Sequence, residues 1–101
     1  MDTAFEDMPL INNELSRQLE LVIDGVKAKI EYDMQKDRMF LLHTEVPPAL
    51  GGRGIGNAIV EKALHYIDEN NLKLVPLCPF VASYVRKHPE WKRLLAHGIS
   101  V

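Results

Sequence analysis

Hydrophobic and polar residues alternate along the first half of the chain with the two-residue period of β-strands. In residues 18–23 every second side chain is a leucine or isoleucine, which predicts a strand. The Asp24-Gly25 pair that follows is a common two-residue hairpin turn. Residues 26–34 alternate apolar and mostly charged side chains, so they predict a second strand with one face in water.

A third strand and a long helix follow. Residues 39–46 are apolar on both faces through Leu42, which predicts a strand in the centre of a sheet. Apolar side chains in residues 55–67 then recur at spacings of three and four, so they form one face of a helix. The two asparagines at 70–71 are suitable residues for its end.

The rest of the chain predicts one more strand and one more helix. Residues 72–76 are short and apolar, as expected of a fourth strand. Residues 79–87 predict a short helix with Phe80 among its inward-facing residues, and 90–95 predict a last helical turn. The resulting fold class is α/β (α+β), with three antiparallel strands followed by helix, strand and helix.

Length and composition indicate one small domain. The chain has 101 residues, enough for a single core, and its 47% hydrophobic and 26% charged residues are typical of a globular protein. Residues 1–13 are acidic and lack a clear period, so they predict a flexible leader or an added strand, with the domain at 14–101. A net charge of −2 without a basic run argues against nucleic acid or membrane as partner. The single cysteine forms no internal disulfide and favours a cytoplasmic location.

The junction between the third strand and the long helix is rich in glycine. Four of the chain's six glycines lie there, together with Arg53. They leave backbone amides bare at the positive end of a helix dipole, which predicts a site for a phosphate or pyrophosphate. The alternative is a tight turn into the helix, for which glycine is the default residue. The four glycines are Gly51, Gly52, Gly54 and Gly56.

The loop lacks the Gly-Lys-Ser/Thr ending of a Walker A motif, and the chain is too short for a doubly wound dinucleotide fold. It resembles the acetyl-CoA loop of the GNAT acyltransferases, Arg/Gln-x-x-Gly-x-Gly/Ala. Gly54 and Gly56 take the two small positions, whereas Gly51 stands where Arg or Gln is usual and Arg53 lies two residues on. The resemblance implies that CoA is bound by Val46, Gly51, Gly52, Arg53, Gly54, Ile55 and Gly56.

Downstream motifs extend this resemblance over nearly the whole chain. A Pro-x-Cys segment ending at Cys78, then Tyr84, then His88-Pro-Glu-Trp91 follow in order. This order is similar to the minimal GNAT-like proteins of the YjdJ type. It implies a reduced GNAT fold without the usual N-terminal substrate-binding helices, acetyl-CoA as co-substrate and an undefined amine acceptor.

Cys78 is the proposed catalytic residue that this resemblance implies. It lies between a predicted strand and a predicted helix, where a helix N-terminus favours the thiolate. A thiolate there can accept an acetyl group from a CoA thioester and pass it on. The alternative is a buried small hydrophobe, which is the commonest role of cysteine.

Three other residues are candidates for proton transfer. Tyr84 lies where GNAT enzymes often carry a tyrosine that protonates the CoA thiolate. The alternative is core packing with its hydroxyl bonded to the backbone. Glu45 and His43 end the third strand on one face, where either can act as base toward an amine or be a plain strand-end residue. Histidines and Cys78 show no ligand spacing, so no metal is expected.

Three classes of function therefore stay open. The first is an acetyl-CoA-dependent N-acyltransferase, acting by direct attack or through Cys78. The second is a module that binds CoA or acetyl-CoA without turnover. The third is an interaction domain whose glycines are purely structural.

Overall fold

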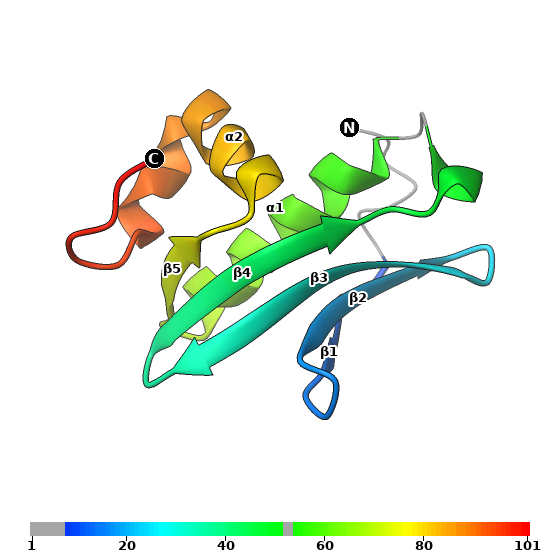
Figure 1. The fold of residues 1–101 in the computed structure, drawn as a ribbon, viewed down its shortest axis with the longest axis horizontal. Coiled ribbons are helices and arrows are strands. Elements are labelled where there is room, and N and C mark those ends of the chain that lie inside the picture. The colour runs from blue at the N-terminus through cyan, green and yellow to red at the C-terminus, as the bar shows by residue number, and fades with distance from the viewer. Residues whose placement is uncertain (1–7, 52–53) are drawn as a thin grey trace.

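The computed structural model describes residues 8–51 and 54–101, and they form a mixed α/β fold (Figure 1). Within these residues the elements are five strands, two α-helices and two short 3-10 helices. Their order is β1 (Ile11–Asn13), β2 (Gln18–Ile23), β3 (Val26–Gln35), β4 (Arg38–Glu45), η2 (Pro48–Leu50), α1 (Ile55–Glu69), β5 (Lys73–Pro76), α2 (Pro79–Lys87) and η3 (Pro89–Leu94).

The strands form one sheet in the order β1-β2-β3-β4-β5. The first three pairings are antiparallel. β4 and β5 are parallel, because α1 carries the chain back across the sheet between them. The predicted antiparallel strands and the helix-strand-helix that follows are thus confirmed.

Local sequence explains the turns and the ends of the helices. Asp24 and Gly25 both have positive φ, 52° and 76°, as a two-residue hairpin of this twist requires. α1 stops at Glu69, and its C-cap is Asn70, as the sequence predicts. α2 begins at a proline and ends before His88, since a residue that precedes proline avoids the helical conformation.

The prediction of a flexible leader up to residue 13 is corrected in part. Ile11–Asn13 form the edge strand β1, which pairs with β2 in the register Asn12↔Leu19. A three-residue strand is too short to show a period, so the pattern left a leader and an added strand open, and the structure shows the strand at residues 11–13. Residues 1–7 lie outside the described part of the chain.

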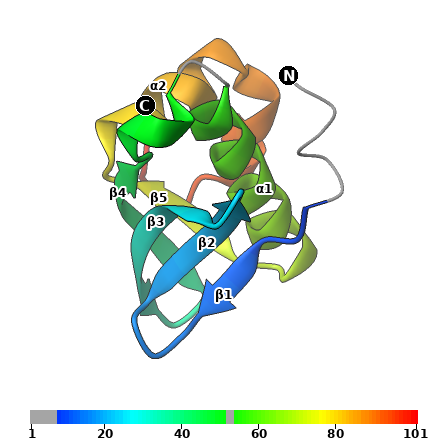
Figure 2. The ribbon, with the colours of Figure 1, turned by 90° about the vertical axis from the view of Figure 1, so that its right-hand side faces the viewer.

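The hydrophobic core lies between the sheet and α1, which covers one face of the sheet (Figure 2). Alternate residues of β2 and β3 and the apolar stripe of α1 meet there. The stripe consists of Ile55, Ala58, Ile59, Val60, Ala63, Leu64 and Ile67. The other face of β4 is open: Phe40 is only half-buried and Leu42 is 42% exposed. The predicted place of β4 inside the sheet is confirmed, since β4 pairs with both β3 and β5, but its outer face is open to solvent at Leu42.

β4 contains a bulge that changes which side chains face the core. Tyr32 pairs with Leu41, but the next β3 residue, Glu31, pairs with His43, so Leu42 is an extra residue. Beyond the bulge Thr44 pairs with Ile30, which is fully buried. In an unbroken register Thr44 would instead oppose Lys29 on the outer face. The bulge therefore turns Thr44 toward the core side.

None of the helices within 8–51 and 54–101 has both the length and the apolar character needed to cross a membrane.

Candidate functional site

The glycine-rich junction begins with η2 and leads into α1. The Gly51 amide donates to the carbonyl of Pro48 at 3.0 Å, which closes η2. Gly54 is the N-cap of α1 and has a left-handed backbone with φ 72°. The first helical bond shown runs from the amide of Ala58 to the carbonyl of Gly54 at 3.1 Å. The amides of residues 55–57 precede it, so they have no partner inside the helix.

The three residues that carry these amides line a shallow pocket of about 350 Å³. Five of the residues predicted to bind CoA line it, namely Val46, Gly51, Gly54, Ile55 and Gly56. The two others, Gly52 and Arg53, lie outside the described residues. The first turn of α1 carries no acidic side chain that would repel an anion. The pocket therefore fits an anionic ligand at a helix N-terminus.

The pocket has three further lining residues that the sequence did not reveal, Leu50, Asn57 and Phe80. Phe80 was expected to face inward but is 44% exposed, because its ring lies over Gly56. A Cβ on Gly56 would approach the Cζ atom of Phe80 to 2.9 Å. The glycine at position 56 therefore has a packing role, because it leaves room for this ring, in addition to any role in binding an anion.

Cys78 lies between β5 and α2, two residues before Phe80. Its amide donates to the carbonyl of Leu41 at 2.8 Å, which continues the contact between β5 and β4. Its thiol is 3% exposed and lies 3.4 Å from the hydroxyl of Thr44. The structure therefore brings the predicted nucleophile to the same end of the sheet as the glycine loop, with Phe80 between them.

The environment of Cys78 favours the thiolate. Burial raises the pKa of the thiol, but hydrogen bonds from the Thr44 hydroxyl and from the amides of Val81 and Phe80 lower it by more. The pKa of Cys78 therefore lies below its ordinary value. These two amides belong to the first turn of α2, where backbone donors stabilise a thiolate. Thr44 is a site residue that no motif indicates, since only the bulge in β4 directs it to the thiol.

Replacing Thr44 by valine should raise the pKa of Cys78, because the variant removes a donor that stabilises the thiolate. The rate of alkylation by iodoacetamide follows the thiolate fraction, so its midpoint should move to higher pH and the reaction should slow at neutral pH. Thr44→Ser keeps the hydroxyl and should behave as the native protein. An unchanged midpoint in Thr44→Val would show that this hydroxyl does not act on the thiol.

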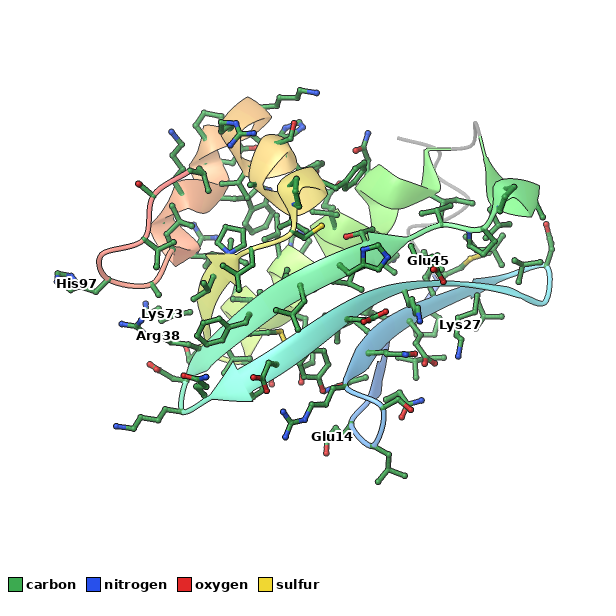
Figure 3. The ribbon with its side chains drawn as sticks, viewed as in Figure 1. Glu14, Lys27, Arg38, Glu45, Lys73 and His97 are labelled. Carbon is green, nitrogen blue, oxygen red and sulfur yellow. The ribbon has the colours of Figure 1, made fainter. Side chains whose placement is uncertain are left out.

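His43 and Glu45 share one face of β4, as predicted, and it is the face away from α1. Both are exposed, and the carboxylate of Glu45 lies 3.9 Å from the ammonium of Lys29. Figure 3 shows Glu45 at the end of β4 that leads to the glycine loop. A base at either residue would therefore act from the opposite face of β4 to that of Thr44.

Tyr84 does not line the glycine-loop pocket among its described residues. Its hydroxyl donates to Glu61 of α1 at 3.4 Å, and its ring lies against His88 with centroids 4.3 Å apart. Burial and the charge of Glu61 raise the pKa of Tyr84 to about 12. These contacts match the core-packing interpretation of this residue. Its role as an acid stays a prediction.

Groups of three or more histidine, cysteine and carboxylate side chains that suit a metal ion are absent from residues 8–51 and 54–101. His65 instead packs edge-on against Trp91, with ring centroids 4.9 Å apart.

Comparison with known proteins identifies the family. A model of the GCN5-related N-acetyl-transferase family matches residues 18–94. Protein NATD1 of Xenopus tropicalis is 33% identical over 76 residues, which are 72% of this chain and 70% of that protein. NATD1 of Danio rerio is 30% identical over 86 residues, which are 80% and 78% of the two chains.

The fold also matches a solved structure. A GCN5-like protein from Staphylococcus aureus, determined by NMR, superimposes with a TM-score of 0.68 over 93% of this chain and 92% of its own. At 23% sequence identity this match supports the fold alone. The resemblance drawn from the glycine loop and the downstream motifs is confirmed. The chain belongs to the GCN5-related N-acetyl-transferase family.

Proposed function

We propose that the protein is an acetyl-CoA-dependent N-acyltransferase that passes the acetyl group through Cys78 to an amine. One observation carries this proposal. Phe80 lines the glycine-loop pocket and lies two residues after Cys78 at the start of the same helix. A CoA molecule held at the loop therefore lies close to the Cys78 thiol, whose pKa is lowered.

The loop supplies what CoA needs for binding. The amides of residues 55–57, which have no partner inside the helix, and the dipole of α1 favour the pyrophosphate. Gly54 adopts its left-handed backbone without strain from a side chain and so forms the turn that leads into these amides. Gly51 and Gly56 add no side chain that would fill the pocket. We propose Gly52 and Arg53 as further CoA-binding residues.

The chemistry balances without a further reagent. The thiolate of Cys78 attacks the acetyl carbonyl, and the carbon–sulfur bond to CoA breaks with CoA leaving as a thiolate. The amine then attacks the new thioester and loses a proton to a base, and the Cys78 thiolate leaves. Because both thioesters are activated, orientation and proton removal supply most of the catalysis. We propose His43 or Glu45 as the base.

A second function has an observation in its favour. Cys78 is nearly inaccessible at 3% exposure, and the hydroxyl of Tyr84 is engaged by Glu61. Both features suit a module that binds CoA or acetyl-CoA without turnover. This module would share the loop contacts with the enzyme but would form no acetyl-cysteine.

The first test is a titration of the protein with CoA, followed by amide chemical shifts and thermal unfolding. A ligand that binds only the native state raises the melting temperature. We expect saturable shifts at Gly51, at residues 54–57 and at Phe80, together with thermal stabilisation. Titration with sulfate alone is the control for a nonspecific anion. If neither quantity changes at millimolar CoA, both CoA-dependent functions are excluded.

A further inference from the structure

A second cavity lies at the other end of α1 from the glycine loop. Its volume is about 380 Å³, which falls in the range of small-molecule sites. We call it the tyrosine cavity. It is formed between the sheet and the last turn of α1 by residues that include Asn12, Glu14, Tyr32, Met39, Tyr66 and Asn70.

Two tyrosines are held in place in this cavity by one asparagine. The hydroxyl of Tyr32 donates to the side-chain oxygen of Asn12, and the Asn12 amide donates to the hydroxyl of Tyr66 at 2.9 Å. Asn12 belongs to the edge strand β1, so this short strand closes the cavity. Because the rings are fixed before any ligand enters, binding would cost little ordering entropy.

The cavity also presents an oxygen acceptor. The side-chain nitrogen of Asn70 donates to the backbone carbonyl of Tyr66 at 2.8 Å. The amide oxygen of Asn70 takes no part in that bond, so it can accept a hydrogen bond from a ligand. Asn70 is also the C-cap of α1, where the helix dipole is negative.

The charges at the mouth favour a cation. Arg17 also lines the cavity, and its guanidinium is paired with Asp33 outside the lining, which compensates its positive charge. In the described part of the chain no basic side chain lies within ion-pair distance of the Glu14 carboxylate. Figure 3 shows Glu14 at the turn between β1 and β2. The uncompensated carboxylate of Glu14 and the negative end of the α1 dipole therefore both favour a positively charged ligand in the cavity.

The lining suits an organic rather than an inorganic cation. The faces of aromatic rings attract ammonium groups, most strongly where water is excluded. Tyr32 is 5% exposed and stays a neutral phenol, since burial is the first cause that raises its pKa. Met34, Met39 and Leu72 add apolar surface that an alkyl chain can cover.

We propose that the tyrosine cavity binds a small organic ammonium ion that carries a short apolar tail. The site is separate from the proposed acyl-transfer site, because the two lie at opposite ends of a helix of 15 residues, about 22 Å long. The inference does not depend on CoA binding or on Cys78.

The test is a titration with n-butylammonium, followed by amide chemical shifts. Butyrate and butan-1-ol are matched probes with a negative charge and with none. We expect saturable shifts at Asn12, Tyr66 and Asn70 with n-butylammonium and at least about threefold weaker binding of the other two probes, the effect of one partly exposed charge. No saturable shift with n-butylammonium, equal binding of butyrate, or shifts confined to the glycine-loop pocket would overturn the proposal.

Two variants locate the binding site. Glu14→Gln keeps the shape of the side chain and should weaken n-butylammonium binding by about threefold at low salt, with a smaller effect at high salt. Glu69→Gln removes an exposed carboxylate outside the lining of the tyrosine cavity and serves as control. Equal affinities in both variants would contradict the role of Glu14.

Leu72→Trp fills the cavity from its lining and should abolish n-butylammonium binding. CoA-dependent shifts at the glycine loop should persist, which shows that the variant is folded. If the filled variant still binds n-butylammonium at the native affinity, the ligand lies elsewhere.

Discussion

Replacing Cys78 by serine is expected to abolish the acetyl-enzyme and the transfer of acetyl groups to amines. The native protein, incubated with acetyl-CoA, should gain the mass of one acetyl group, and peptide mapping should place it on Cys78. Serine keeps a donor and acceptor in place of the thiol, whose sulfur lies 3.4 Å from the Thr44 hydroxyl. At neutral pH, however, the serine hydroxyl is protonated and weakly nucleophilic. Intact-mass spectrometry measures the adduct directly.

The same variant should bind CoA within about twofold of the native affinity, because it leaves the loop amides untouched. This control separates loss of chemistry from loss of binding. If Cys78→Ser transfers acetyl groups at the native rate, the covalent route is wrong, and direct attack by the amine with His43 or Glu45 as base takes its place. If the native protein binds acetyl-CoA but forms no adduct and no product, the non-catalytic module is the function.

Replacing Gly54 by valine is expected to reduce the free energy of unfolding by about 2 kcal/mol, because a β-branched residue is strained at positive φ. The φ of Gly54 is 72°, and a Cβ placed there meets no atom within 4 Å. The cost is therefore strain in the backbone and not a collision. Affinity for CoA should fall by at least about tenfold, because relief of this strain would move the amides of the first helical turn.

Gly54→Asn is the matched control, since asparagine tolerates the left-handed region better than other residues with a side chain. It should lose less than about 1 kcal/mol of unfolding free energy and keep most of the CoA affinity. Urea unfolding measures the first quantity, and calorimetric titration measures the second. Equal destabilisation by valine and asparagine would contradict the left-handed conformation at this position.

The elements of the fold were largely predictable because their signals are local. The period of two in β2 and β3, the period of 3.6 in α1 and the Asp24-Gly25 turn each depend on neighbours in the sequence. The glycine cluster was likewise visible as a strand-to-helix junction, and five of its predicted ligand residues line one pocket. Such local patterns were sufficient to predict the residues of this pocket.

Phe80 shows where local patterns fail. Its position in α2 is compatible with an inward direction, but its ring rests over Gly56 of another helix and lines the pocket. That direction depends on how two helices approach each other across the parallel strands β4 and β5. Asn12 is a comparable case, since a strand of three residues gains its place only by pairing with β2.

The sequence by itself determined the family and the order of the elements, and it predicted the glycine-loop site and the candidate nucleophile Cys78. Only the tertiary structure decided which side chain acts on that nucleophile. The alternation of β4 is interrupted by one extra residue, Leu42, and this bulge reverses the facing of Thr44. A bulge is set by pairing with the neighbouring strand and not by the residues of β4 alone, so the contact between Thr44 and Cys78 is a property of the assembled sheet.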